Sequence, residues 1–322
     1  MTRYILGRLV SLVLVLFIVS LVTFMLMHSV PGGPFDEEKG PLPPAAKANI
    51  LRKYGLDKPV HIQYINYMKN ALMLDFGYPY QAPHTTVTAL IAKSWRITAQ
   101  VGLMTILLAF SIGITVGIIA AYNQNSWIDT TVTFVSMLGV TVPNFVIAIW
   151  LILIFAVRWD ILPMGGWGSS RDCLVGSNYF CSDWVLPVVA YALSPLAVIA
   201  RYTRSSILDV IHQDYVRTAK AKGLSNRATM VRHVFRNAQI PMVTALATEI
   251  PNLMTGSIFI ESMFRINGLG KFFVTSINSR DYPMIMALFL LIAFLWSVTY
   301  LLTDIAYTWI DPRVRLGAKG GS

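Results

Sequence analysis

Cysteine, histidine and charge are all scarce in this chain of 322 residues. It has two cysteines, Cys173 and Cys181, and this number excludes a disulfide-rich scaffold and a cysteine-rich metal site. The five histidines are scattered along the sequence, so no metal site is expected. Charged residues make up 13% of the chain, about half the share found in soluble proteins, while 55% of the residues are hydrophobic. This composition indicates a protein whose main solvent is a lipid bilayer.

Motifs that bind nucleotides or perform catalysis are also lacking. No G-x-x-x-x-G-K-[ST] loop occurs, so we expect the chain to bind no ATP and no other cofactor itself. No H-E-x-x-H motif or G-x-S-x-G elbow occurs, which argues against an enzyme. The net charge of +10 does not indicate a nucleic-acid partner, because the excess charge lies in loops that flank apolar runs.

Long apolar runs predict an all-α membrane protein with six transmembrane helices. Pro143 is expected to kink the third span. The fourth span is short, contains Pro187 and Pro195, and could be broken. Arg3 and Arg8 precede the first run, which is too long for a signal peptide and has no cleavage site after it. The apolar cores of the first two spans are expected near residues 9–27 and 97–121. The third span is expected between Asp129 and Arg158, the fourth over 184–200, the fifth over 239–264 and the sixth between Asp281 and Asp304.

The spans divide the chain into a first helix (1–30), a helical segment outside the membrane (31–93), a core of five spans (94–308) and a tail (309–322). In the outside segment, short helices are expected on either side of Gly55 and Pro59, the second with apolar residues at Ile62, Ile65, Met68 and Leu72. Small residues at Gly102, Gly113 and Gly117 predict close packing of the second span. Outside the long segment, Lys and Arg number 13 on one side of the membrane and six on the other. This asymmetry places both termini and the basic stretch 201–238 in the cytoplasm.

The basic stretch is the most informative part of the chain. Its four-residue spacing from Ile207 through Ile211, Tyr215 and Ala219 to Gly223 predicts one helix face that tapers to a bare backbone. Gly223 suits the left-handed conformation that ends a helix, and Ser225 suits the N-cap of a second one. We interpret the two short helices as a notched docking element. The alternative is a loop that only anchors the topology. The second helix is expected to carry an apolar stripe of Met230, Val231, Val234 and Phe235.

Two carboxylates lie in the fifth span. Glu261 is near its outer end, four residues before Arg265, and we expect its side chain to snorkel to the interface and pair with that arginine. Glu249 lies deeper, where a charge costs about 2.5–3.5 kcal/mol. The hypothesis is that Glu249 lines a translocation path, with Pro251 opening the helix nearby. The alternative is a buried hydrogen bond to a partner subunit.

The motifs from Tyr215 to Leu224, with those around Arg232 and Asn237, resemble the cytoplasmic coupling loop of ABC importer permeases. The resemblance covers nearly the whole chain and is strongest to the B-type permeases of the dipeptide/oligopeptide (peptide/nickel) branch. The general motif of the family begins with Glu, whereas the matching position here is Arg217, so no acidic contact is carried over to it. The positions that resemble the ATPase-coupling motif are Tyr215, Arg217, Thr218, Ala219, Lys220, Gly223 and Leu224.

This resemblance implies a transport subunit that forms half of a translocation path for di- and oligopeptides. It implies a second, homologous permease subunit, two ATPase subunits that use ATP and Mg²⁺, an external binding protein, and a location in a bacterial or archaeal inner membrane. Close relatives suggest nickel chelates, glutathione or oligosaccharides as alternative substrates. The alternative functions are a self-contained secondary carrier or channel, and a structural membrane scaffold.

Cys173 and Cys181 lie eight positions apart in a loop expected outside the cytoplasm. An oxidising environment there permits a disulfide between them, which would stabilise the fold by about 2–3 kcal/mol. The alternative is two free thiols.

Overall fold

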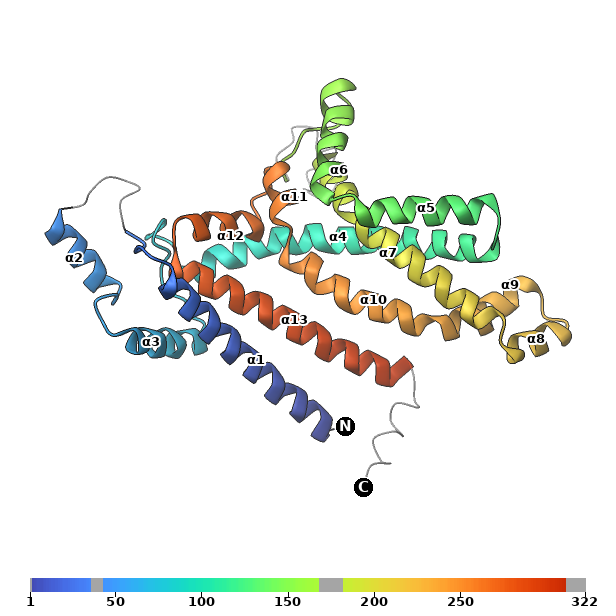
Figure 1. Ribbon diagram of the computed structural model, residues 1–322, viewed down its shortest axis with the longest axis horizontal. Helices are drawn as coiled ribbons and strands as arrows, with labels where there is room; N and C mark the ends of the chain where they lie inside the picture. Colours follow the sequence, from blue (N-terminus) through green and yellow to red (C-terminus); the bar gives the residue numbers. More distant parts are fainter. Residues whose placement is uncertain (1, 36–42, 168–181, 311–322) are drawn as a thin grey trace. The chain divides into compact units, whose positions relative to one another are not determined.

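A computed structural model describes residues 2–35, 43–167 and 182–310, and in these residues every regular element is helical (Figure 1). They form two compact units, one of Met1–Arg96 with Gly268–Val298 and one of Ile97–Asn267 with Thr299–Ser322. The α-helices in chain order are α1 (Thr2–Ser29), α2 (Pro44–Lys53), α3 (Val60–Leu72), α4 (Val87–Tyr122), α5 (Trp127–Thr141), α6 (Asn144–Leu151), α7 (Val185–Ile211), α8 (Asp214–Ala221), α9 (Asn226–Thr229), α10 (Arg236–Thr255), α11 (Ile258–Met263), α12 (Leu269–Asn278) and α13 (Tyr282–Ile310). The short η elements are η1 (Ile152–Arg158), η2 (Ser182–Trp184) and η3 (Met230–Phe235).

Within the described residues, five helical stretches are long and apolar enough to cross a membrane: Leu6–Ser29, Val87–Tyr122, Ser182–Ile211, Pro241–Met263 and Tyr282–Ile305. A sixth span results if α5 and the run from α6 through η1 count as one broken span. These two pieces are bent by 102° at Val142 and Pro143. The predicted kink at Pro143 is therefore confirmed as a break, because proline offers no N–H to continue the helix. The predicted all-α membrane fold is confirmed, and the predicted six spans are reached when this bent pair counts as one span.

The fourth span differs from the expectation of a short, broken helix. Helix α7 runs without a break from Val185 to Ile211. Pro187 lies in its first turn, where the missing N–H has no helical partner to lose. Pro195 lies inside the helix, and prolines in the interior are tolerated in membrane helices. As a result, Arg201 and Arg204 belong to α7 and not to the loop that follows it.

In the first unit, the segment between the first two spans forms α2 and α3, as predicted. Gly55 has a φ of +67°, and α3 begins after Pro59. The apolar residues Ile62 and Ile65 on α3 are exposed, whereas Tyr64 and Tyr67 pack against a core made by α1 and the start of α13. A second core of this unit joins the start of α4 to α12 and α13 through Val87, Trp95, Leu269, Met284 and Leu288.

In the second unit, glycines on α4 allow other helices to approach closely, as predicted. A Cβ atom at Gly117 would come within 2.6 Å of the carbonyl oxygen of Ala200, and one at Gly113 within 2.9 Å of the carbonyl oxygen of Leu196. Gly102 meets the backbone of Leu253 on α10 in the same way. Small residues at close helix crossings replace side-chain packing with direct backbone approach. The glycines thus bring α4 against α7 and α10.

Candidate functional site

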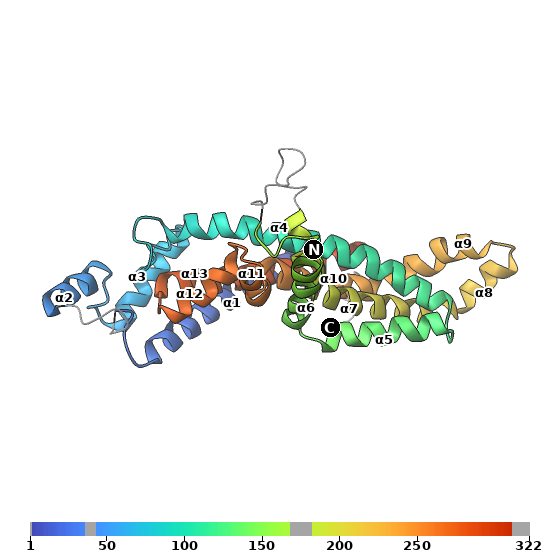
Figure 2. The same cartoon turned by 90° about the horizontal axis from the view of Figure 1, so that it is seen from above.

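Helices α8 and α9 lie side by side beyond the ends of α7 and α10, and both views show this (Figures 1 and 2). Helix α8 is held by Val216 and Ala219, which are 0% and 5% exposed and lie three residues apart on one face. Val216 packs with Ile207 of α7 and with Met230 and Val234 of η3. The opposite face of α8 is open to solvent, with the exposed side chains of Tyr215, Arg217, Thr218, Lys220 and Lys222.

The end of α8 is set by Gly223, as predicted. Its φ is +84°, the N–H of Gly223 donates to the Lys220 carbonyl at 2.9 Å, and the N–H of Leu224 donates to the Ala219 carbonyl at 3.3 Å. This pair of bonds is a Schellman motif, in which a left-handed residue satisfies the last carbonyls of a helix. Ser225 then caps α9, because its hydroxyl accepts a hydrogen bond from the Ala228 N–H at 3.3 Å. Both predicted signals at this turn are confirmed.

The predicted single helix face from Ile207 to Gly223 is wrong. The chain leaves α7 at His212 and restarts in α8 after Gln213, so the four-residue spacing does not run through one helix. Ala219 faces the interior of the unit and is buried, while Tyr215 is 42% exposed. Ala219 therefore helps to hold α8 against the unit. The coupling-motif residues that a partner can reach are the exposed ones beside it, Tyr215, Arg217, Thr218 and Lys220.

The apolar stripe expected after Ser225 is confirmed only in part. Met230 and Val234 are buried, but Val231 is 60% exposed. The π-helical turn η3 shifts the spacing of side chains relative to an α-helix, and this shift turns Val231 outward. On the solvent side, the Nδ2 of Asn237 donates to the Tyr215 hydroxyl at 3.1 Å and so ties α10 to α8.

A notch of about 190 Å³ opens beside α8 and α9. Thr229 lines it, and its hydroxyl is buried without a hydrogen-bond partner among the described residues. A buried hydroxyl without a hydrogen-bond partner costs about 1–3 kcal/mol. The notch is lined by Tyr122, Ile211, Lys220, Asn226, Thr229, Met230 and Val234.

An ion pair at the start of α5 was not anticipated from the sequence. Asp129 is 4% exposed, and both oxygens of its carboxylate contact the Arg204 guanidinium of α7: Nε donates to Oδ1, and a terminal nitrogen donates to Oδ2 at 2.7 Å. The backbone N–H of Asn125 also donates to Asp129 Oδ2 at 3.0 Å. The sequence signal that could have indicated this pair is the position of Asp129 at the edge of an apolar run, with Arg204 at the end of a later apolar run. The pair joins the turn after α4 to the helix that leads into α8.

The carboxylate of Glu261 lies deeper than expected. Glu261 is 2% exposed and accepts a hydrogen bond from the Thr98 hydroxyl at 2.7 Å, so the predicted snorkelling side chain at the outer end of the span is wrong. The helix breaks between α10 and α11 at Gly256, whose φ is +87°. A Cβ at Gly256 would lie 2.5 Å from the Glu261 carboxylate. The sequence indicated the charge of Glu261 but not the break that buries it.

Glu249 lies on α10, where it is half-buried. Pro251 lies two residues further on, and α10 continues through it to Thr255. The carbonyl of Asn252 accepts a hydrogen bond from the Tyr191 hydroxyl of α7 at 3.1 Å, which holds the two helices together at this level. The predicted opening of the helix by Pro251 is therefore wrong, and the break in this span comes at Gly256, after α10 has ended.

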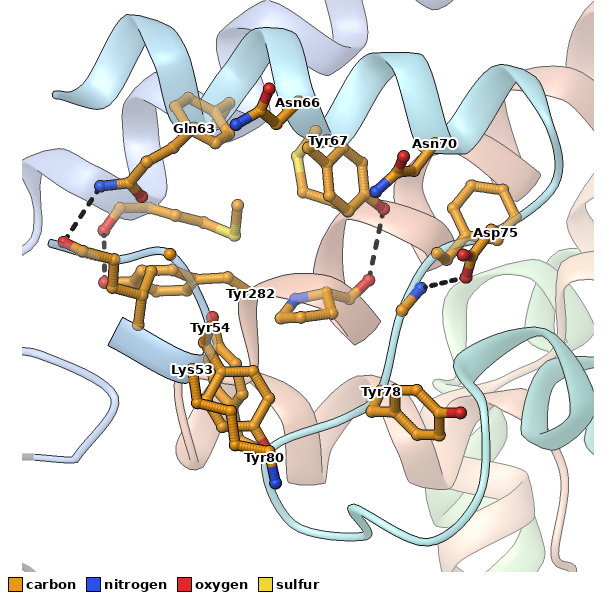
Figure 3. Close-up of a pocket in the computed structure, with 18 of the residues that line it drawn as sticks. Lys53, Tyr54, Gln63, Asn66, Tyr67, Asn70, Asp75, Tyr78, Tyr80 and Tyr282 are labelled. Atoms are coloured by element: carbon orange, nitrogen blue, oxygen red, sulfur yellow. Dashed lines mark hydrogen bonds between the residues drawn. The ribbon is translucent and has the colours of Figure 1, made fainter. Parts of the chain in front are cut away.

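The first unit contains a cavity of about 730 Å³, which we call the aromatic cavity (Figure 3). Its walls come from α1, α2, α3, the loop before α4 and the start of α13. Aromatic rings follow one another around it: the ring centres of Tyr54 and Tyr80 are 4.8 Å apart, those of Tyr80 and Tyr282 are 6.2 Å apart, and those of Tyr282 and His28 are 5.1 Å apart. Sequence reasoning missed the cavity, because its walls are distant in the chain.

Burial raises the pKa of several groups in this part of the chain. The pKa of the Tyr67 and Tyr80 phenols is raised, first by burial and, for Tyr80, then by the nearby Asp281 carboxylate. Burial also raises the pKa of Asp281, against hydrogen bonds from the backbone N–H groups of Met284 and Gln81, both at 3.4 Å. Tyr67 and Tyr80 therefore remain neutral at ordinary pH.

The sequence matches two family models that together span most of the chain. Residues 113–316 match "Binding-protein-dependent transport system inner membrane component", and residues 1–116 match the model for the N-terminal part of such membrane components. The chain belongs to this family of binding-protein-dependent transport components. The predicted membership in the ABC importer permeases is thereby confirmed.

Curated relatives of this family match over nearly their whole length. The dipeptide transport system permease protein DppB of Bacillus subtilis is 38% identical over 99% of this chain and 100% of the relative. The oligopeptide transport system permease protein OppB of Salmonella typhimurium is 37% identical over 98% of this chain and 100% of the relative. OppB of Escherichia coli is 36% identical over the same shares.

Solved structures give the same fold. A chain of the MetNI methionine ABC transporter in an inward-facing conformation matches with a TM-score of 0.55 and 16% identity, over 69% of this chain and 96% of that one. A second crystal form of the same transporter matches with a TM-score of 0.56. At this identity the likeness supports the fold alone.

The two cysteines, Cys173 and Cys181, lie outside the described residues, so the disulfide stays a prediction.

Proposed function

We propose that this chain is the membrane-spanning permease subunit of an ATP-driven importer of di- and oligopeptides. The observation that carries the proposal is full-length similarity to dipeptide and oligopeptide permeases at 35–38% identity. In this proposal a second homologous permease completes the path, an external binding protein delivers the peptide, and two ATPase subunits bind ATP and Mg²⁺. The complex lies in a bacterial or archaeal inner membrane.

In the proposed orientation, the termini and the α8–α9 element face the cytoplasm, and α2 and α3 lie outside. The distribution of Lys and Arg supports this orientation, since α8 and α9 with their flanking residues carry much of the basic charge outside the long segment.

The α8–α9 element is the proposed ATPase-docking site. Two features support docking over a mere topology anchor. The Schellman turn at Gly223 fixes the angle between α8 and α9, which a simple anchor does not need. The notch beside them is a concave surface lined in part by the exposed polar side chains of Lys220 and Asn226, to which a partner can bind. In this reading the exposed face of α8, from Tyr215 to Lys222, contacts the ATPase, and α7 passes the motion of the docked helix into the membrane.

The test is a pair of substitutions at Gly223. A Cβ at this position meets no atom within 4 Å, so a tryptophan side chain would project outward from the turn. Asparagine is the matched control, because it accepts the positive φ but adds little bulk. We expect Gly223→Asn to keep most activity, and Gly223→Trp to lower both peptide uptake and stimulated ATP hydrolysis in proteoliposomes containing all subunits.

Membrane yield and thermal stability of both variants are measured alongside, because the Gly223→Trp backbone carries about 1–2 kcal/mol of strain. Wild-type uptake by Gly223→Trp would leave only the topology-anchor interpretation. Uptake that needs neither ATP nor the ATPase subunits would identify a self-contained carrier instead.

Substitution of Ala219 is a poor test of docking, since a large side chain there would disrupt the packing of α8 against the unit's own core.

For Glu249 we propose a place along the translocation path. A half-buried carboxylate in a membrane span is costly next to lipid, so it is expected to face water or protein. A path-lining carboxylate offers a weak contact to the ammonium group of a passing peptide. The competing explanation is a hydrogen bond to the second permease subunit.

A further inference from the structure

The aromatic cavity of the first unit has the size and lining of a small-molecule site. Its volume of about 730 Å³ falls within the range of about 300–1,000 Å³ that ligand pockets occupy. Such pockets combine apolar and aromatic walls with a few convergent polar groups. The described residues that line this one include seven aromatic rings, namely Phe24, Tyr54, Tyr67, Phe76, Tyr78, Tyr80 and Tyr282.

The inner wall of the cavity is formed by rings that are already held in place. Phe24 of α1 stacks on His28, with ring centres 4.2 Å apart. The Tyr67 hydroxyl donates to the Pro283 carbonyl at 3.4 Å, and the Tyr282 hydroxyl donates to the Met27 carbonyl at 3.3 Å. These contacts tie the rings to α1, α3 and α13, so the wall exists before any ligand arrives. A preformed wall reduces the entropy lost on binding.

The outer part of the cavity carries exposed polar side chains. Asn66 and Asn70 lie four residues apart on one face of α3, and both are exposed. Asp75 is also exposed, and its Oδ1 accepts a hydrogen bond from the Gly77 N–H at 2.9 Å, which fixes the carboxylate. Figure 3 shows Asp75 next to Asn70 on one side of the cavity.

A positive charge lies on the other side. The ammonium group of Lys53 lies 5.7 Å from the centre of the Tyr54 ring, and Figure 3 shows it beside Tyr54 and Tyr80, away from Asp75. The cavity therefore offers an anion at one side, a cation at the other, a lining of aromatic rings, and the side-chain amides of Asn66 and Asn70 along α3. A lipid acyl chain carries no charge that could pair with Asp75 or Lys53. A simple anion or cation could pair with only one of them.

From this arrangement we infer that the aromatic cavity binds a short peptide as a zwitterion. The peptide ammonium lies at Asp75, the terminal carboxylate lies at Lys53, and an apolar or aromatic side chain packs against the tyrosine rings. Asn66 and Asn70 supply hydrogen bonds to the peptide groups between the termini. The inference rests on the proposed import of peptides and adds to it a binding site in the segment between the first two spans.

The test measures peptide binding to the assembled transporter in nanodiscs, without ATP and without the binding protein. The probe is a tripeptide with free termini and a central phenylalanine, and the comparison ligand is the same tripeptide acetylated and amidated. We expect saturable binding of the free tripeptide and at least tenfold weaker binding of the blocked one, because charge-assisted hydrogen bonds at both ends are lost.

Two variants test the assigned charges. Asp75→Asn keeps an oxygen that can accept the Gly77 N–H, and so removes the charge but not the turn. Lys53→Gln removes the opposite charge. Each is expected to raise the Kd about five- to tenfold. Lys69→Gln is the matched control, because Lys69 is an exposed residue of α3 outside the cavity, and its Kd should equal that of the unmodified protein.

A photoreactive form of the tripeptide locates the site by mass spectrometry. Crosslinks to residues 53–84 or 282–286 support the inference. Crosslinks confined to α10, or equal Kd values for Asp75→Asn and Lys69→Gln, overturn it. ATP-driven uptake is measured separately on the complete system with its binding protein. Uptake without cavity binding rejects the cavity and keeps the importer, whereas cavity binding without uptake rejects the importer.

Discussion

Removing the arginine of the Asp129–Arg204 pair is expected to destabilise the second unit measurably. In an Arg204→Gln variant the Asp129 carboxylate, 4% exposed, keeps the N–H of Asn125 but loses its cation. Breaking a fully buried pair in this way costs about 3–5 kcal/mol. The Arg204 side chain is 27% exposed, and water can reach part of the site. We therefore expect a loss of about 2–3 kcal/mol, below the fully buried range.

The assay is thermal unfolding of the purified transporter, followed by tryptophan fluorescence. One kcal/mol shifts the Tm of a large domain by about 2–4 °C, so Arg204→Gln is expected to lower the Tm by about 4–12 °C. Arg201→Gln is the matched control, because Arg201 is an exposed residue one turn earlier on α7. Surface substitutions of this kind usually change stability by less than about 0.5 kcal/mol.

A double substitution separates the pair from other effects of losing an arginine. In Asp129→Asn with Arg204→Gln, no buried charge remains, so the Tm should lie above that expected from adding the two single losses. Equal Tm values for Arg204→Gln and Arg201→Gln, or strict additivity in the double variant, would refute the reasoning. Because α7 leads directly into α8, we also expect Arg204→Gln to lower peptide uptake by more than the loss of folded transporter accounts for.

Three other predictions concern single residues. Gly256→Ala should lower the free energy of unfolding by about 2–4 kcal/mol, since it combines a strained φ with a clash against Glu261. Gly55→Ala also has a positive φ but no atom within 4 Å, so it should lower this free energy by only about 1 kcal/mol in the same assay. The raised pKa of Asp281 means that the folded protein holds this proton more tightly than the unfolded chain, so between that raised value and the ordinary value near 3.8 the Tm should rise as pH falls. Asp281→Asn should lack this contribution, and parallel Tm curves for the two proteins would contradict the assignment. Glu249→Gln should assemble normally and alter uptake of peptides with a free amine, and unchanged uptake of both free and amine-blocked peptides would remove Glu249 from the path.

The sequence by itself was sufficient where a structural feature depends on one residue and its neighbours. Gly223 ends α8 because only glycine takes a positive φ without strain, and Pro143 breaks the third span because it lacks an N–H. Ser225 caps α9 through a bond that spans three residues. The length and apolar character of the spans follow from composition alone, since the bilayer demands about 20 apolar residues for each helix. The family resemblance of the coupling motif was also readable from the linear order of its residues.

Tertiary structure decided the features that join distant parts of the chain. The burial of Ala219 depends on which face of α8 meets the core of its unit, and four-residue spacing could not reveal that α7 ends before α8 begins. The Thr98–Glu261 hydrogen bond spans 163 positions and the Asp129–Arg204 pair spans 75. The aromatic cavity brings residues near 24, 54, 67, 80 and 282 together. Side-chain periodicity specifies a local helix face, but only packing selects the partner that this face meets.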